Sequence, residues 1–110
     1  MAYDAGLASR IADTLAGMGE RHIRQKNVFG GRGFLAGKST FAIAWEDGLI
    51  VKVVPADYAA LRESPGVRPF APDGEKPMST WLVVDAEVIA DDPELTDWLR
   101  RALTAMRDKT

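Results

Sequence analysis

Large apolar residues occupy every second position on both sides of Asp47-Gly48, and this is the clearest pattern in the chain. The positions are Phe41, Ile43 and Trp45 before the dipeptide and Leu49, Val51 and Val53 after it. Alternation with a period of two is typical of a strand that buries one face, and Asp-Gly favours a tight hairpin turn. The pattern therefore predicts two directly paired strands over residues 40–45 and 49–54.

Apolar residues recur with the period of an α-helix at both ends of the chain. The first set is Leu7, Ile11, Leu15 and Met18, and the last is Leu95, Trp98, Leu99, Ala102, Leu103 and Met106. We expect Asp4 to cap a helix over residues 4–19 and Gly19 to end it, because glycine readily takes the left-handed conformation. Asp92 at the cap and Pro93 at the first helical position mark the start of the last helix.

The segments between these elements carry shorter patterns. Residues 23–29 predict a first strand, after which glycines at 30, 31, 33 and 37 are expected to interrupt regular structure. Pro69 lacks a backbone donor, so the strand that contains it is expected at an edge or bulge. The remaining predictions are a short helix from Pro55 to Ser64-Pro65-Gly66, a fourth strand at 67–70, a turn at 72–74 and a fifth strand at 80–85.

The predicted order is α-β-β-β-α-β-β-α, which gives an α+β fold with a five-stranded antiparallel sheet. No repeat, low-complexity tract or linker divides the 110 residues, so we expect a single domain over 1–110. The two terminal helices are expected to cover one face of the sheet. The opposite face or an edge is then the expected working surface.

Composition narrows the class of protein. Hydrophobic residues make up 46% and charged residues 27%, which is typical of a chain that folds on its own. There are no cysteines, which excludes disulfides and thiolate metal ligands and suits a reducing compartment. No stretch approaches the roughly 20 apolar residues that span a bilayer. We therefore expect a cytoplasmic protein without a membrane partner.

Charge is unevenly distributed, although the net charge is only −2. Residues 21–45 hold five cations and no acid, whereas residues 85–97 hold only acids among their charged residues. The five cations are Arg21, Arg24, Lys26, Arg32 and Lys38. They are candidates for a nucleic-acid or partner surface, since phosphates and acidic proteins both attract Arg and Lys. A solvated strand face is the alternative interpretation.

Two motifs partly match patterns of phosphate binding or catalysis, but each lacks a residue or element that the pattern needs. Gly37-Lys38-Ser39-Thr40 ends like a phosphate-binding loop, but Arg32 stands where the first glycine is needed and a predicted strand follows instead of a helix. The only histidine is His22, and no serine stands in the nucleophile-elbow pattern that such a histidine would activate as a general base. We therefore expect no catalytic residue, no metal ligand and no cofactor-binding residue.

Several short motifs agree in order and spacing with one known family. They are Met1-Ala2-Tyr3-Asp4, Val28-Phe29-Gly30-Gly31 with Gly33-Phe34, Pro55-Ala56-Asp57-Tyr58, Pro65-Gly66-Val67-Arg68-Pro69-Phe70, Lys76-Pro77-Met78 and Trp81-Leu82-Val83-Val84-Asp85. Together they resemble the N-terminal domain of the TfoX/Sxy family of competence regulators. The resemblance implies a two-layer α/β sandwich similar to type III secretion chaperones, and a regulator of transcription that acts with partner proteins.

The resemblance also implies roles for the motif residues. The residues expected to be structural are Phe29, Gly30, Gly31, Phe34, Arg68, Pro69, Phe70 and Trp81. Phe29 is expected in the core, with Gly30-Gly31 forming a bend, and the Arg68-Pro69-Phe70 segment is a structural corner or part of a partner surface. Family members carry a second, C-terminal helical domain, and because this sequence ends at Thr110 we expect a stand-alone domain.

Three hypotheses for function follow. The leading one is a non-enzymatic regulatory module that binds another protein, or a second copy of itself, through a sheet face or edge. The opposed basic and acidic segments would allow such a homodimer. The second hypothesis is a nucleic-acid-binding protein that uses the five cations. The third is a small-molecule or enzymatic site lined by Trp45, Tyr58 or Trp81.

Overall fold

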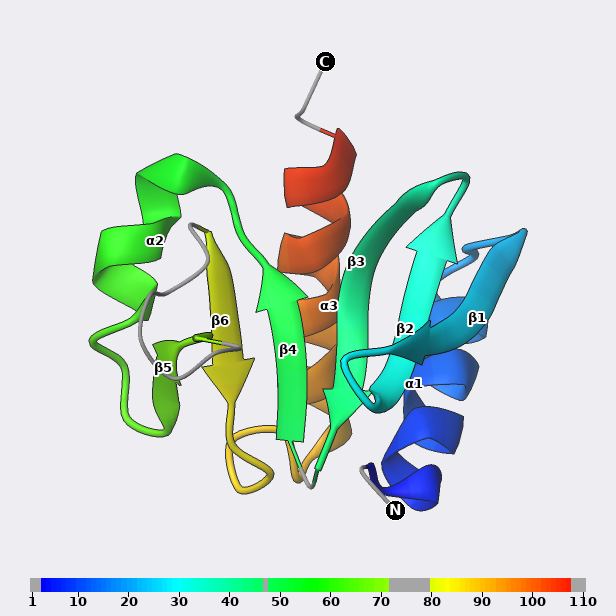
Figure 1. The fold of residues 1–110 in the computed structure, drawn as a ribbon, viewed down its shortest axis with the longest axis horizontal. Coiled ribbons are helices and arrows are strands. Elements are labelled where there is room, and N and C mark those ends of the chain that lie inside the picture. Colours follow the sequence, from blue (N-terminus) through cyan, green and yellow to red (C-terminus); the bar gives the residue numbers. More distant parts are fainter. Residues whose placement is uncertain (1–2, 47, 72–79, 108–110) are drawn as a thin grey trace.

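A computed structural model of the chain describes residues 3–46, 48–71 and 80–107. Figure 1 shows the arrangement of its helices and strands, which confirms the α+β class. The helices are α1 (Ala5–Gly17), α2 (Pro55–Leu61) and α3 (Asp92–Arg107). The strands are β1 (Ile23–Val28), β2 (Gly31–Ala36), β3 (Ser39–Trp45), β4 (Gly48–Lys52), β5 (Val67–Pro69) and β6 (Trp81–Val84). The turn predicted at 72–74 lies outside the described residues.

The strands form one antiparallel sheet in the order β1-β2-β3-β4-β6-β5. The predicted pairing of 40–45 with 49–54 is confirmed, since Ala42 lies opposite Val51 and Ile43 opposite Ile50. The predicted edge position of the strand with Pro69 is also confirmed, because β5 is the last strand in the order. The two edges of the sheet are therefore β1 and β5.

The sheet has six strands among the described residues, so the prediction of five was wrong. The missed strand is β2, which contains two of the glycines expected to interrupt regular structure. A side chain at Gly31 would place its Cβ 2.3 Å from the carbonyl oxygen of Ala44, and one at Gly33 would come within 2.7 Å of Val28. These glycines allow neighbouring strands to approach closely, and the strand continues through them.

The bend predicted at Phe29-Gly30-Gly31 is a tight turn between β1 and β2. Phe29 and Gly30 have φ angles of 53° and 78°, and Val28 pairs with Gly31. Two successive left-handed residues are what a two-residue hairpin turn requires. The expectation that Phe29 is in the core was wrong, since 53% of its surface is exposed. A turn residue at the end of a hairpin points away from both strands, so the core does not reach it.

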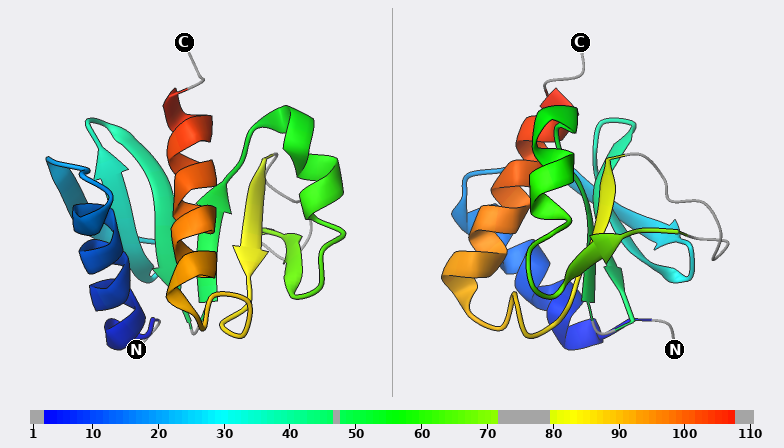
Figure 2. Two further views of the ribbon diagram at one scale, coloured as in Figure 1. Left: turned by 180° about the vertical axis from the view of Figure 1, so that it is seen from behind. Right: turned by 90° about the vertical axis from the view of Figure 1, so that its left-hand side faces the viewer.

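The terminal helices α1 and α3 cover one face of the sheet, as predicted (Figure 2). Asp4 caps α1 by accepting hydrogen bonds from the backbone N–H groups of Gly6, at 2.8 Å, and Leu7, at 3.3 Å. Gly19 follows the helix with a φ of 84°. The buried residues between the layers include Ile11, Leu15, Phe34, Phe41, Leu49, Leu82, Leu95, Trp98 and Leu99. Tyr58 and Leu61 of α2 pack against the same core.

The face of the sheet opposite α1 and α3, the open face, carries a smaller apolar cluster. Its buried members are Ile43, Ile50, Phe70 and Val83, with Val28, Trp45 and Trp81 packed against them. Trp45 and Trp81 are half-buried, whereas Trp98 lies in the helix-side core. Within the described ranges, no helix has both the length and the apolar character needed to cross a membrane.

Candidate functional site

Strand β1 is an edge strand of the sheet (Figure 1). It pairs with β2 on one side only, and its four central residues, 24–27, are all exposed. No other strand of the described chain lies against its outer side. An edge of this kind presents unpaired backbone N–H and C=O groups, which are a template for pairing with another extended chain.

The turn geometry decides which backbone groups point outward. In a two-residue hairpin, Val28 and Gly31 next to the turn form a hydrogen-bonded pair, and such pairs alternate along an antiparallel ladder. Arg24, Lys26 and Val28 therefore direct their backbone groups toward β2. Ile23, Gln25 and Asn27 direct theirs to the outside, so these three residues offer the free donors and acceptors.

The side chains of β1 divide between the two faces. Gln25 lies opposite Phe34, which belongs to the helix-side core, so Gln25 faces the helices. Val28 packs against the cluster on the opposite face, and strand alternation places Arg24 and Lys26 on that face with it. One edge strand thus presents cations on the open face and amides on the helix side.

The structure brings the predicted cations together around this edge. Arg24 and Lys26 lie on β1, and Arg21 precedes it. Lys38 lies in the turn between β2 and β3, where the guanidinium of Arg24 donates to the carbonyl oxygen of Gly37 at 2.6 Å. Arg32 instead lies on the helix side of β2, where it donates to the amide oxygens of Gln25, at 3.0 Å, and Asn27, at 3.3 Å.

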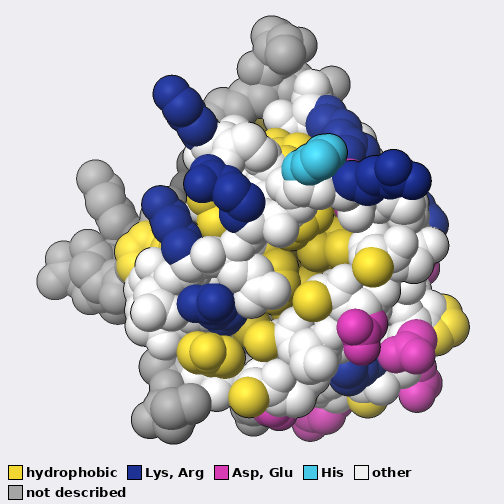
Figure 3. All heavy atoms as spheres, turned by 90° about the vertical axis from the view of Figure 1, so that its right-hand side faces the viewer, with side chains coloured by type: hydrophobic (Ala, Val, Ile, Leu, Met, Phe, Trp, Pro, Cys, Tyr) yellow, Lys and Arg dark blue, Asp and Glu magenta, His cyan; other side chains and the backbone are white. Residues whose placement is uncertain are grey.

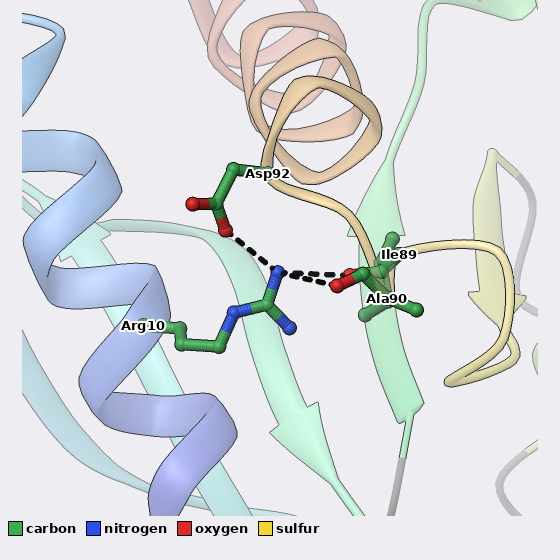
Figure 4. A network of polar contacts seen from close by, with 4 residues as sticks. All are labelled: Arg10, Ile89, Ala90 and Asp92. Atoms are coloured by element: carbon green, nitrogen blue, oxygen red, sulfur yellow. Dashed lines mark hydrogen bonds and ion pairs between the residues drawn. The ribbon is translucent and has the colours of Figure 1, made fainter.

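None of these five cations forms an ion pair with a carboxylate within the described ranges. Arg10 is the contrast, because one of its nitrogens donates to the carbonyl oxygens of Ile89 and Ala90 and to Asp92, at 3.0, 3.3 and 2.9 Å (Figure 4). Those contacts tie α1 to the start of α3. Arg24 and Arg32 donate only to uncharged oxygens, so no carboxylate of the described chain neutralises the charges at the β1 edge.

A hollow of about 230 Å³ lies beside β1 on the helix side. Its apolar lining comes from α1, β1 and β2, and Glu20, His22 and Gln25 contribute polar lining. The apolar residues are Ala12, Leu15, Ala16, Ile23 and Phe34. Glu20 is paired with Arg107 of α3. Figure 3 shows the hydrophobic hollow next to a row of Lys and Arg side chains.

Sequence reasoning missed this hollow. Its residues come from three elements that are separated along the chain, and only the register of β1 against β2 places Ile23 and Phe34 near α1. One signal was available, because Ala12 and Ala16 are small residues at i and i+4 and so share one flank of α1. Small residues on a helix flank leave space between the helix and a neighbouring strand.

The motif residues in and after β5 contact Asp85 and the aromatic residues Phe29 and Trp45. Arg68 pairs with Asp85 across β5 and β6. The ring of Phe70 meets those of Phe29 and Trp45 edge-on, with centroids 5.4 and 5.7 Å apart. The indole N–H of Trp45 also donates to the carbonyl oxygen of Phe29 at 3.2 Å. These contacts hold the β1–β2 turn against the residue that follows β5.

The three aromatic residues proposed to line a ligand pocket do not share a side of the sheet. Trp45 and Trp81 pack on the open face, whereas Tyr58 packs against the helix-side core. Among the described residues, no group of three or more His, Asp and Glu side chains is placed to hold a metal ion. The β1 edge and its hollow therefore form the candidate functional site.

A comparison with protein families identifies the chain. The model of the TfoX N-terminal domain matches residues 13–106, which include β1 and every residue of the hollow except Ala12. The chain belongs to the TfoX N-terminal domain family. Neither a curated protein nor a solved structure matches it.

Proposed function

We propose that this TfoX N-terminal domain is a non-enzymatic regulatory module of the cytoplasm that acts by binding another protein through the β1 edge. One observation carries the proposal: β1 is an exposed edge strand whose nearby cations have no carboxylate partner among the described residues. Backbone groups at a sheet edge supply affinity for an extended chain, and the side chains beside them supply specificity.

The non-enzymatic part of the proposal rests on the lack of a catalytic constellation. His22 is exposed on the rim of the hollow, and no hydrogen bond joins it to another side chain within the described ranges. A general base needs a positioned partner within hydrogen-bond reach of the group that it activates. We therefore assign His22 no catalytic role.

Nucleic-acid binding is the second candidate, and the exposure of Phe29 favours it. Exposed aromatic rings next to cations can stack on the bases of single strands. Against it, the ring of Phe29 already contacts Phe70, and Arg32 donates to amides on the helix side instead of joining Arg24 and Lys26 on the open face. The net charge of −2 also opposes binding to a phosphate backbone.

Capture of partners from the source cells tests the proposed function. The bait is the full chain, compared with the double variant Arg24→Glu/Lys26→Glu and with the control Arg62→Glu/Arg100→Glu, which makes the same charge change outside β1. We expect a protein that is retained by the wild type and the control and lost from the β1 variant. Nuclease treatment separates proteins held through nucleic acid. The same proteins on all three baits, or loss on nuclease treatment, would contradict the proposal.

A further inference from the structure

We infer that the β1 edge accepts an extended segment of a partner protein in which acidic and apolar residues alternate. The segment is added as a further strand, with its acidic side chains beside Arg24 and Lys26 and one apolar side chain in the hollow between α1 and β1. This inference rests on the proposed function and names the chemistry of the partner.

The backbone of β1 suits an added antiparallel strand. Ile23, Gln25 and Asn27 carry the outward N–H and C=O groups, so Gln25 forms a hydrogen-bonded pair with the residue opposite it. Arg24 and Lys26 then fall at non-hydrogen-bonded positions, where facing side chains approach most closely, with Cα atoms about 4.5 Å apart. The cations of β1 are thus at the positions where cross-strand charge has its largest effect.

The open-face positions of the added strand are expected to be acidic. Arg24 and Lys26 are exposed, share one face and form no ion pair in the part of the chain that the structure describes. Opposite charges in facing positions stabilise strand pairing, and like charges oppose it. Two such positions, separated by one residue, select a segment with Asp or Glu at every second position.

The helix-side position of the added strand is expected to be apolar. The residue opposite Gln25 points toward the hollow, whose lining includes Gln25, Ile23 and Phe34. Its volume of about 230 Å³ lies below the ~300–1,000 Å³ of small-molecule sites, so it suits one large side chain better than a metabolite. Glu20 at this site is already paired with Arg107, which reduces its repulsion of an acidic segment.

A second copy of this chain is a poorer occupant of the same edge. A symmetric antiparallel pair of β1 strands has its two-fold axis normal to the sheet, which places like faces together. The registers that pair most of β1 then set Arg24 opposite Lys26, or Lys26 opposite its own copy. Like charges directly opposite each other destabilise a strand pair, so the same cations that attract an acidic segment disfavour self-association.

A defined peptide tests the inference. The probe is a fluorescent peptide of about eight residues in which glutamate alternates with leucine, a length typical of one strand. Its control has the same residues in two blocks, all glutamates and then all leucines. We expect the alternating peptide to bind the wild-type chain about tenfold more tightly than the blocked one, and to slow amide exchange at Gln25 and Asn27.

Variants separate the two parts of the recognition. Arg24→Glu/Lys26→Glu is expected to weaken binding about tenfold, whereas Arg62→Glu/Arg100→Glu leaves it unchanged. Ala16→Leu partly fills the hollow, so it is expected to weaken binding of the leucine peptide about threefold and to spare a peptide with threonine in place of leucine. The matched control is Ala60→Leu, at an exposed position of α2.

Three outcomes would overturn the inference: equal binding of the alternating and blocked peptides, binding without slower exchange in β1, or tighter binding of single-stranded DNA than of the peptide. Circular dichroism of each variant confirms that it is folded. Failure of the peptide together with successful capture of a protein through β1 would overturn the alternating segment and leave the proposed function standing. Failure of the capture experiment would contradict the proposed function itself.

Discussion

The two edges of the sheet differ in ways that bear on function. Strand β1 has six residues, no proline and two cations that form no ion pair within the described chain, whereas β5 has three residues, ends at Pro69 and carries Arg68 in an ion pair with Asp85. Short length, proline and internal charge pairing are ordinary ways to prevent an edge from pairing with other chains. The β5 edge has three features that oppose the addition of a strand, whereas the β1 edge has only its charge.

The largest expected effect comes from removing the Phe34 side chain, which lies in the helix-side core opposite Gln25 of β1. Phe34 is completely buried beneath the open edge, so Phe34→Ala is expected to cost about 3–5 kcal/mol of unfolding free energy. The control is Phe29→Ala, at the exposed turn, for which we expect about 1 kcal/mol or less. Urea denaturation measures both. Equal losses would contradict the difference in burial.

The second effect tests the close approach of β2 to β3. Gly31→Ala places a Cβ against the backbone of Ala44, which cannot move aside as a side chain end can, so we expect a loss of about 1–3 kcal/mol. Gly17→Ala is the control, because nothing lies within 4 Å of its added Cβ and alanine favours helix. Thermal unfolding of both variants gives the comparison, and a stable Gly31→Ala protein would refute it.

The third effect is expected when a proline is placed in β1, as Pro69 is in β5. Gln25→Pro removes an outward N–H while leaving the ladder between β1 and β2 in place, so it is expected to weaken binding of the alternating peptide about tenfold. Stability is expected to change by about 1 kcal/mol or less, since the backbone hydrogen bonds between β1 and β2 are kept and only the exposed side-chain bond from Arg32 to Gln25 is lost. Gln25→Thr keeps the N–H and serves as the control. Unchanged peptide affinity in the proline variant would show that the backbone edge is not used.

The smallest effect is expected at the β5 edge. Arg68→Ala removes an exposed ion pair with Asp85, and such pairs contribute about 0–1 kcal/mol. We expect a change in that range, smaller still at high salt, and no change in peptide binding. Titration calorimetry and urea denaturation at two salt concentrations measure both quantities. A large loss of peptide affinity would place the binding site at β5 instead of β1.

Local patterns predicted the parts of this fold that local interactions decide. The alternation at 41–45 and 49–53, the cap at Asp4 and the left-handed Gly19 each follow from a residue and its near neighbours. The same reasoning failed for Gly31 and Gly33. Their place in a strand depends on Ala44 and Val28, which approach them only when the sheet is assembled.

In the candidate site, too, the sequence predicted the local features and missed those that depend on distant residues. The five cations were predicted as a possible surface, and the structure places four of them on β1, β2 and the turns beside these strands, with Arg21 just before β1. Sequence alone did not separate Arg32, which bonds to Gln25 and Asn27, from Lys26, which has no such partner among the described residues. Nor did it reveal the hollow, since Ala16 and Phe34 belong to different layers of the fold.

The sequence by itself determined the family, the α+β class and most helix and strand positions, because periodicity and turn chemistry act over a few residues. It also showed that five cations and no acid lie in one segment of the chain, residues 21–45. Only the tertiary structure decided that β1 is an open edge, that its cations lie on one face and that a hollow lies on the other. Strand order and helix packing depend on contacts between distant residues, and no local pattern records them.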